Sequence, residues 1–345
     1  MNSKIVVITT GGTIGSILQS GAVSVDLSAN KIAKEIEIAK QTLGYDIEVI
    51  SPINKNSEAL APSDWLDILL SIQTTSATDA SGIVVTHGTD TLVYTVSAAV
   101  ALGHLWNKKI CFTGAFYSPD NPSSDTSLSL LAALEFAASS HLKSGVFVAF
   151  RSNENNSEAR ILNGFDVKPM SFDDSYFGAL YNNVLASYSP KYGLSDPISS
   201  KDITYPKIET TSLPDKKAIE AAQAKICCIT LYPGIDKSVL QAVTMGRDIV
   251  IIELYHSGTG PYGADYNDLI EHLREHADKT LFLLASFPSQ YIQTPYDSSR
   301  ALIDAGGCIY KDVQSHFLYV FSLLSLALGN TNEQIKSQLA DWQMG

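Results

Sequence analysis

Short runs of apolar, mostly β-branched residues alternate with longer helical patterns along most of this chain. In the first half, the runs expected as strands are Lys4–Thr9, Asp46–Ser51, Gly82–Thr86, Lys109–Thr113 and Gly145–Phe150. The stretches between them predict helices at Ser28–Thr42, Ser63–Thr74, Thr91–Trp106 and Ser123–Ser140. Ser63 and Ser123 are the expected N-caps of two of these helices. Nearly all-apolar strands that alternate with helices predict a parallel sheet covered on both faces, which is an α/β fold.

The second half repeats this alternation on a smaller scale. Its expected strands are Lys225–Leu231, Asp248–Leu254, Thr280–Ser286 and Cys308–Tyr310. Its expected helices are Asp236–Met245, Ala264–His276, Ser298–Ala305 and Ser315–Leu328. A proline-rich stretch without periodicity separates the halves. We therefore predict a larger N-terminal domain (1–187) with a flavodoxin-like parallel sheet, a linker (188–220) and a smaller C-terminal α/β domain (221–345).

The charge and the N-terminus limit the possible partners and compartments. A formal net charge of −12 argues against nucleic acid and anionic membrane as partners, because both select clustered Lys and Arg. No apolar run is long enough to span a membrane. Met1–Lys4 leads directly into the first strand without a secretory pattern, and the four cysteines lack metal-ligand spacing. We expect a cytoplasmic protein with reduced thiols.

Three of the expected parallel strands end in loops of Gly, Thr and Asp. These loops are Thr10–Gly15, His87–Thr91 and Gly114–Ala115. Because parallel strands end at the same edge of a sheet, the loops should converge on one crevice. Thr13 and Thr89 are candidate hydroxyl nucleophiles, Asp90 is placed to orient a base, and amides near Gly88 could hold an oxyanion. Together they indicate acyl transfer from an amide or ester.

Two of these loops carry a family resemblance. Thr-Gly-Gly-Thr-Ile at 10–14 and His-Gly-Thr-Asp-Thr at 87–91 resemble the signature motifs of bacterial-type L-asparaginases, in the asparaginase/glutaminase superfamily. The short N-terminus resembles the cytoplasmic, type I-like branch. The resemblance implies a two-domain α/β fold and hydrolysis of L-asparagine to L-aspartate and ammonia. It also implies no cofactor, no metal and a homodimer or homotetramer.

The resemblance assigns roles to individual residues. Thr13 matches the nucleophile, and Thr89 matches a second essential threonine supported by Asp90 and a lysine. Ser57 is expected to bind the substrate α-carboxylate, and Glu58, with Asp90, the α-ammonium.

Two further positions, Gly88 and Ala115, are predicted to bind substrate. Aligning Arg160–Leu162 with the family puts Pro169 at the lysine position, so a one-residue insertion selects Lys168 as the lysine. The tyrosine that the family usually carries after its first motif is missing from Ser16–Asp26.

Alternative functions fit parts of the sequence. One is a deamidating amidotransferase subunit, of which Gly21-Ala22-Val23 is reminiscent, although it would need a partner-binding extension before the first strand. Another is a non-catalytic amino-acid-binding protein with the same fold, which only the missing tyrosine supports. Gly258–Gly263 matches a dinucleotide-binding pattern, but Pro261 removes a backbone donor that a pyrophosphate needs, so we expect no nucleotide.

Overall fold

The chain forms two compact units. The computed structural model describes residues 3–12, 16–19, 22–25, 30–140, 144–155, 157–196, 205–263, 267–287, 289 and 294–344. Unit 1 consists of Met1–Ile203 with Thr211–Leu213, and unit 2 of Thr204–Thr210 with Pro214–Gly345.

Unit 1 is built on an eight-stranded mixed sheet with the strand order β10-β9-β8-β7-β6-β5-β1-β4. Five neighbouring strands, β4, β1, β5, β6 and β7, are parallel, and β8, β9 and β10 extend the sheet in antiparallel fashion. Their bounds are β1 (Lys4–Thr9), β4 (Asp46–Ile50), β5 (Gly82–Thr86), β6 (Lys109–Thr113), β7 (Gly145–Arg151), β8 (Ala159–Asn163), β9 (Ala186–Ser189) and β10 (Gly193–Leu194). A separate antiparallel hairpin, β2 (Ser16–Gln19) and β3 (Ala22–Val25), follows β1.

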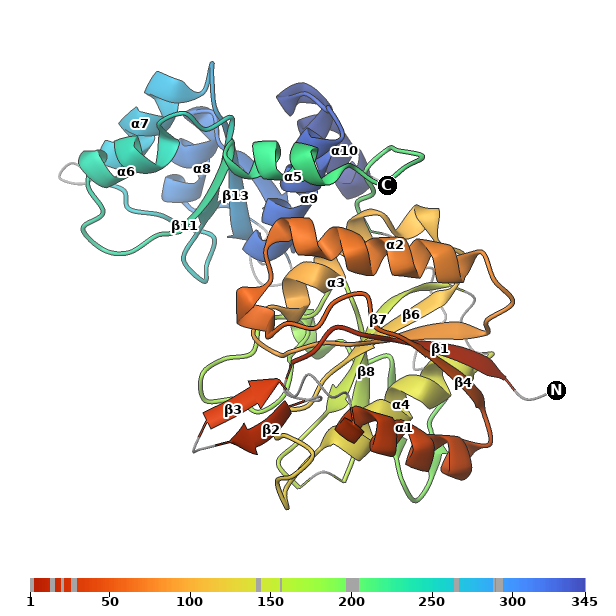
Figure 1. Cartoon of the computed structure of the whole chain (residues 1–345). Helices are drawn as coiled ribbons and strands as arrows, with labels where there is room; N and C mark the ends of the chain where they lie inside the picture. The colour runs from red at the N-terminus through yellow and green to blue at the C-terminus, as the bar shows by residue number, and fades with distance from the viewer. Residues whose placement is uncertain are drawn as a thin grey trace. The chain divides into compact units, whose positions relative to one another are not determined.

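Helices cover both faces of this sheet, as expected for strands that are apolar on both sides. They are α1 (Asn30–Leu43), α2 (Trp65–Ser76), α3 (Leu92–Ala101) and α4 (Thr126–Ala138). Helices α1 and α4 pack on one face and share a core with Val7, Val84 and Phe147, while α2 and α3 lie on the other (Figure 1). The carboxyl ends of β1, β4, β5, β6 and β7 therefore lie along one edge, here called the loop edge of unit 1.

Unit 2 contains a four-stranded parallel sheet in the order β11-β12-β13-β14. Its elements are α5 (Lys216–Gln223), β11 (Ile226–Thr230), α6 (Lys237–Thr244), β12 (Ile249–Glu253), α7 (Asp268–His276), β13 (Leu281–Phe287), α8 (Asp297–Asp304), β14 (Cys308–Lys311), α9 (Ser315–Ala327) and α10 (Asn332–Met344). Side chains of α6, α7 and α8 form an apolar core with β12 and β13. Helix α9 packs against β11, β12 and β13 and against α5.

The predicted α/β class, with a large helix-flanked sheet and a smaller second sheet, is confirmed. The sequence did not predict β8–β10, the β2–β3 hairpin, α5 or α10. Both predicted N-caps are wrong, because the N-cap position of α2 is Asp64 and that of α4 is Asp125, and neither side chain bonds to its helix. Across the part of the chain that the structure describes, no helix is both long and apolar enough to cross a membrane.

Candidate functional site

The loop after β1 contacts two other loops at the loop edge of unit 1. The Thr10 hydroxyl donates to the carbonyl of Thr86 at 2.8 Å. Gly11 and Gly12 both have positive φ, at 102° and 79°, which disfavours any other residue. A Cβ atom at Gly12 would lie 2.4 Å from the Gly88 Cα, and one at Gly11 would lie 2.4 Å from the Lys55 oxygen. Thr13, the predicted nucleophile, follows Gly12 directly but lies outside the described residues.

His87 connects the loop after β5 to its surroundings. Its side chain is fully buried, and its amide donates to the Thr113 carbonyl at 2.8 Å. Its Nδ1 donates to the Gly88 carbonyl at 2.8 Å, because a carbonyl can only accept. The Thr95 hydroxyl then donates to Nε2, also at 2.8 Å. Burial lowers the pKa of His87 from 6.5 to about 4, so the ring is neutral near pH 7 and fixes the Gly88 peptide.

Ser57 and Asp90 meet beside Gly88. Ser57 is buried, and its hydroxyl donates to Asp90 Oδ2 at 3.4 Å. The Thr91 hydroxyl donates to the Ser57 carbonyl at 2.7 Å, and a Cβ atom at Gly88 would lie 2.6 Å from Ser57 Oγ. Asp90 and Glu58 are exposed, and Thr89 is half-buried. An exposed carboxylate next to a buried hydroxyl suits the ammonium and carboxylate of an amino acid.

The loop after β6 completes the loop edge. A Cβ atom at Gly114 would lie 2.6 Å from the His87 oxygen. The side chain of Ala115 is fully buried in the core shared with α4, so only its backbone can face a ligand. Asp125, at the start of α4, accepts the backbone amides of Phe116 and Tyr117 at 3.0 Å. The structure thus brings Gly88, Ser57, Asp90 and the Ala115 loop together.

Lys168 is not part of this group in the structure. Strand β8 is antiparallel to β7, with Asn163 opposite Phe147, so the chain leaves β8 away from the loop edge. The Lys168 side chain is exposed, and its amide donates to the Gly178 carbonyl at 2.9 Å. Within the described residues, no ion pair or hydrogen bond joins Lys168 to Thr89 or Asp90. The role of Lys168 stays a prediction.

Sequence reasoning missed a different lysine at the loop edge. The Lys55 amide donates to the Thr10 carbonyl at 3.0 Å, and Lys55 Nζ contacts both carboxylate oxygens of buried Asp64 at 2.8 Å. Lys55 thereby ties the segment that carries Ser57 to the start of α2. Its position two residues before Ser57 was the available signal. His87 belonged to a recognised motif but had no assigned role.

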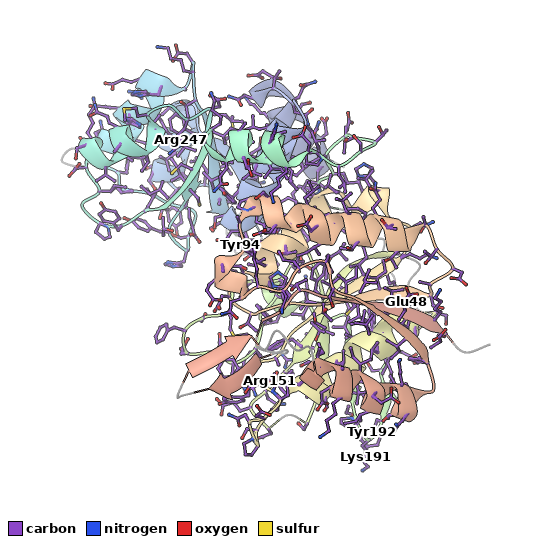
Figure 2. The ribbon with its side chains drawn as sticks, in the orientation of Figure 1. Glu48, Tyr94, Arg151, Lys191, Tyr192 and Arg247 are labelled. Atoms are coloured by element: carbon purple, nitrogen blue, oxygen red, sulfur yellow. The ribbon has the colours of Figure 1, made fainter. Side chains whose placement is uncertain are left out.

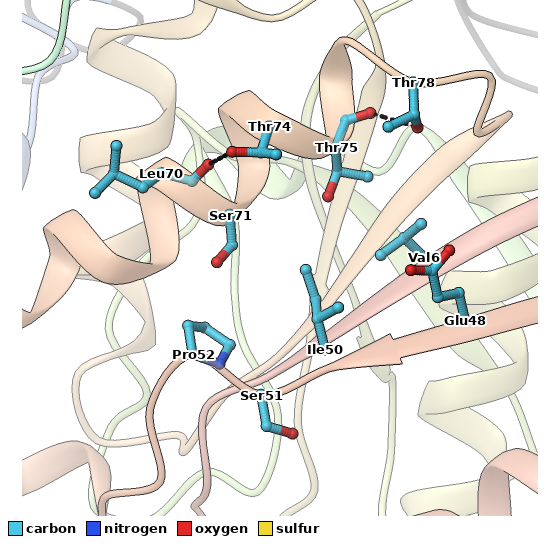
Figure 3. A pocket seen from close by; sticks show the side chains of 10 residues that line it. All are labelled: Val6, Glu48, Ile50, Ser51, Pro52, Leu70, Ser71, Thr74, Thr75 and Thr78. Carbon is cyan, nitrogen blue, oxygen red and sulfur yellow. Dashed lines mark hydrogen bonds between the residues drawn. The ribbon is translucent and has the colours of Figure 1, made fainter.

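An open pocket of about 450 Å³ lies on unit 1 between the carboxyl end of β4 and α2 (Figure 3). Its walls include Val6, Ile50 and Leu70. The hydroxyls of Thr74 and Thr78 donate to carbonyls of their own chain segment, at Leu70 and Thr75 (Figure 3). None of the predicted site residues lines this pocket, so its size does not identify it as the reactive site.

The residues that form the loop edge fall within a known family. The family described as "Asparaginase, N-terminal" matches residues 4–176. This chain belongs to the asparaginase family. The loop edge of this asparaginase-family chain contains the described part of the first motif, Thr10–Gly12, and the whole of the second, His87–Thr91.

The relatives of this chain include amidotransferase subunits and an L-asparaginase. The chain is 33% identical over 299 residues to a glutamyl-tRNA(Gln) amidotransferase subunit of Nanoarchaeum equitans (strain Kin4-M), covering 85% of this chain and 71% of the relative. It is 26% identical over 337 residues to an L-asparaginase of Thermococcus kodakarensis (strain ATCC BAA-918 / JCM 12380 / KOD1), covering 96% of this chain and 94% of the relative.

Solved structures agree with the fold. The thermostable L-asparaginase from Thermococcus kodakarensis superposes with a TM-score of 0.74 at 26% identity, covering 97% of this chain and 96% of that one. A probable cytoplasmic L-asparaginase from Campylobacter jejuni gives a TM-score of 0.72 at 20% identity, covering 98% and 99%, and shows the fold alone. These similarities confirm the asparaginase superfamily. They do not confirm the type I-like branch, because amidotransferase subunits are among the relatives.

Proposed function

We propose that this chain is an amidohydrolase that hydrolyses the side-chain amide of L-asparagine to give L-aspartate and ammonia. The observation that carries the proposal is the close packing of Gly12, Gly88, Ser57 and Asp90 at the loop edge. Family membership and similarity to an L-asparaginase support the same chemistry.

The amino-acid head of the substrate would bind at Ser57 and Asp90. The long 3.4 Å bond between their side chains is weak, so a substrate can replace it. Ser57 would then donate to the α-carboxylate, and Asp90, with Glu58, would accept the α-ammonium. The side-chain amide of the substrate would then lie near Gly12 and Gly88.

The proposed reaction has two steps. The hydroxyl oxygen of Thr13 attacks the amide carbon and loses its proton, the carbon–nitrogen bond breaks, and the nitrogen leaves as ammonia after taking up a proton. Water then hydrolyses the resulting ester and regenerates Thr13. Backbone amides near Gly12 and Gly88 would stabilise the oxyanion in both steps.

The base for the Thr89–Asp90 pair is proposed on resemblance alone. Lys168 holds that position in the predicted alignment, and Lys55 is the lysine that the structure places beside the first motif. Replacing each by Met in separate variants discriminates between them. Loss of turnover in Lys168→Met and retention in Lys55→Met would support the alignment, and the opposite pattern would move the role to Lys55.

Ammonia release by the purified protein tests the proposal. We expect turnover of L-asparagine and a loss of ~10² or more in a folded Thr13→Ala variant. L-glutamine should be the poorer substrate, because one methylene moves the amide carbon by ~1.5 Å and a ~1 Å misplacement can reduce the rate ~10². Wild-type turnover by Thr13→Ala would exclude the proposed nucleophile, and a kcat/KM for glutamine at or above that for asparagine would exclude the proposed preference.

A second candidate function is a deamidating subunit of an amidotransferase, favoured by the 33% identical relative of that name. In that case, the released ammonia would serve a companion subunit that acts on glutamyl-tRNA. A chain that is slow alone but accelerated by glutamyl-tRNA and a companion subunit would support this function. Full turnover by the isolated chain would support the first.

We also propose a cytoplasmic homodimer or homotetramer, on the family resemblance. Light scattering at assay concentration tests the assembly. An active monomer would exclude it.

A further inference from the structure

A buried cation lies at the end of β7, next to the Ala115 loop. Arg151 is the last residue of β7 and is only 2% exposed (Figure 2). Ala149 pairs with Thr113, the last residue of β6, so Arg151 and Ala115 each come two residues after this pair. A fully buried guanidinium at this edge requires an explanation, since a buried charge is unfavourable without partners.

The guanidinium holds the side chains that follow Ala115. Its central carbon lies 5.0 Å from the centroid of the Phe116 ring and 5.4 Å from that of the Tyr117 ring. The two rings meet edge to face, with centroids 4.8 Å apart. Arg151 Nε also donates to the Ser175 carbonyl at 2.8 Å. The planar, permanently charged arginine side chain suits such stacking better than lysine does.

Asp125 holds the backbone of the same two residues. Its fully buried carboxylate accepts the Phe116 amide through both oxygens, at 3.0 and 3.1 Å, and the Tyr117 amide at 3.0 Å. Asp125 is the N-cap residue of α4 but makes no side-chain bond to that helix. Burial outweighs the opposing effects of the two amides and the Arg151 charge and raises the pKa of Asp125. The hydrogen bonds of this side chain go to the backbone of the loop and not to α4.

We propose that Arg151 and Asp125 are positioning residues for the amidohydrolase reaction, which together fix the Gly114–Tyr117 segment so that the Ala115 backbone faces the substrate. Arg151 packs against the side chains of Phe116 and Tyr117, and Asp125 accepts hydrogen bonds from their backbone amides. The inference rests on the proposed function.

The position of the Gly114–Tyr117 segment also affects the neighbouring motif, His87–Thr91. Gly114 lies so close to the His87 carbonyl that a Cβ atom there would be 2.6 Å from the His87 oxygen. A loop that moves toward His87 must displace the residue whose ring holds Gly88. Removing Arg151 alone leaves the buried Asp125 carboxylate without a compensating charge, so Arg151→Met should lose stability as well as the position of the loop.

A second buried cation provides a matched control. Lys109 is 2% exposed at the first residue of β6, which is the opposite edge of the same sheet. Its ammonium lies 5.7 Å from the Phe136 centroid and donates to the Ser139 carbonyl and hydroxyl. Both residues are thus buried cations beside aromatic rings, but only Arg151 adjoins the Ala115 loop.

Steady-state kinetics of Arg151→Met, Arg151→Lys and Lys109→Met on L-asparagine test the proposal. We expect Arg151→Met to lose ~10² in kcat while KM changes less than ~3-fold, as for misplaced reacting groups. Arg151→Lys should recover part of kcat, and Lys109→Met should keep kcat within ~2-fold even if it melts earlier. If Arg151→Met does not fold, Phe116→Leu removes one stacked ring, keeps both charges and should lose ~10-fold in kcat.

The results separate this role from a general loss of stability. Equal kcat losses in Arg151→Met and Lys109→Met, or an unchanged kcat in a folded Arg151→Met or Phe116→Leu, would overturn the positioning role alone. A wild-type protein that releases no ammonia from L-asparagine would overturn the proposed function and, with it, this inference.

Discussion

The glycines at the strand ends of the two units meet different surroundings. In unit 1, a Cβ atom at Gly11, Gly12 or Gly88 would meet a Lys55 backbone oxygen, Gly88 backbone atoms or the Ser57 hydroxyl. In unit 2, a Cβ atom at Gly258 would lie 2.4 Å from the Phe287 ring, and one at Gly260 would lie 3.1 to 3.4 Å from Leu231, Leu302 and Leu269. The first set brings polar backbones together, and the second packs a loop on an apolar core.

This difference separates two glycine patterns that look alike in sequence. The loop after β12 closes on itself, with the Tyr255 amide donating to the Thr259 carbonyl at 2.9 Å. Ser299 holds the Gly258 carbonyl at 2.7 Å. Its glycines therefore make room for neighbouring side chains. In unit 1, the glycines let three loops converge, which is what a reactive site requires.

Gly12→Ala and Gly246→Ala test this comparison with the largest expected effect. Both glycines have positive φ, 79° and 72°, but only Gly12 has a close neighbour, since nothing lies within 4 Å of a Cβ atom at Gly246. Each substitution should cost about 1–2 kcal/mol of stability from backbone strain. Gly12→Ala should also reduce kcat/KM ~10² or more, because it pushes the first motif away from Gly88. Equal turnover by both variants would show that the loop after β1 need not contact the loop after β5.

Asp90→Asn and Glu253→Gln compare carboxylates at the two strand ends. Asp90 contacts Ser57, and Glu253 accepts the Thr230 hydroxyl at 2.9 Å at the end of β12. Losing a charged hydrogen bond to the substrate ammonium should reduce kcat/KM ~10- to 10²-fold in Asp90→Asn, mainly through KM. Glu253→Gln should leave both constants within ~2-fold. Kinetics on L-asparagine decide this, and an unchanged KM in Asp90→Asn would remove Asp90 from substrate binding.

Local pattern predicted the strands well and the site only in part. Strands β1, β5 and β6 have the predicted bounds, because each is a continuous apolar run that ends in Gly-containing loops. Strands β8 to β10 lie in a mostly polar stretch that contains Pro169 and Pro190, and they extend the sheet from β7. Pairing with a neighbour, which short-range periodicity does not record, determines those strands.

The candidate site was likewise predicted only in part. Parallel strand direction predicted that the loops with Gly12, Gly88 and Gly114 converge, whereas Ser57 was assigned from the family resemblance. The contributions of Arg151 and Asp125 depend on which rings and amides lie next to them in space. Thr13 lies outside the described residues, so its predicted role depends on resemblance alone.

Buried neutral histidines make the two units respond differently to acid. Burial lowers the pKa of His87 in unit 1 to about 4, and those of His272 and His316 in unit 2 to about 4 and about 3. Unfolded histidine takes a proton near pH 6.5, so native stability falls as the pH drops from 6.5 toward 4. At pH 5, His87 and His316 each contribute a loss of about 2 kcal/mol. With two such histidines, unit 2 should lose more.

Tryptophan positions allow the units to be followed separately. Trp65 and Trp106 are buried in unit 1, and Trp342 belongs to unit 2. In a Trp342→Phe variant, fluorescence reports unit 1 alone, while circular dichroism reports both units. Lowering the pH from 7 to 5 should lower the thermal-unfolding midpoint seen by circular dichroism more than the midpoint seen by fluorescence. Equal shifts of the two midpoints would contradict the predicted difference between the units. His316→Gln should reduce the difference between the two shifts.

Two threonine–histidine pairs give the smallest and most selective test. The Thr95 hydroxyl lies 2.8 Å from Nε2 of His87, and the Thr244 hydroxyl lies 2.8 Å from Nε2 of His272. Both histidines are buried, so replacing either threonine by Val should cost about 1–2 kcal/mol by leaving a ring nitrogen unpaired. Only His87 holds the carbonyl of a residue at the loop edge, Gly88.

Thr95→Val should therefore lower kcat ~3- to 10-fold through a small displacement of Gly88, while Thr244→Val should leave kcat unchanged. Thermal melting confirms that the two variants lose similar stability, and kinetics on L-asparagine then isolate the positional effect. If the two variants melt alike and turn over alike, His87 is a structural histidine like His272, and the glycine contacts alone hold the loop edge. If only Thr95→Val slows, the buried ring transmits its orientation to the substrate through the Gly88 peptide.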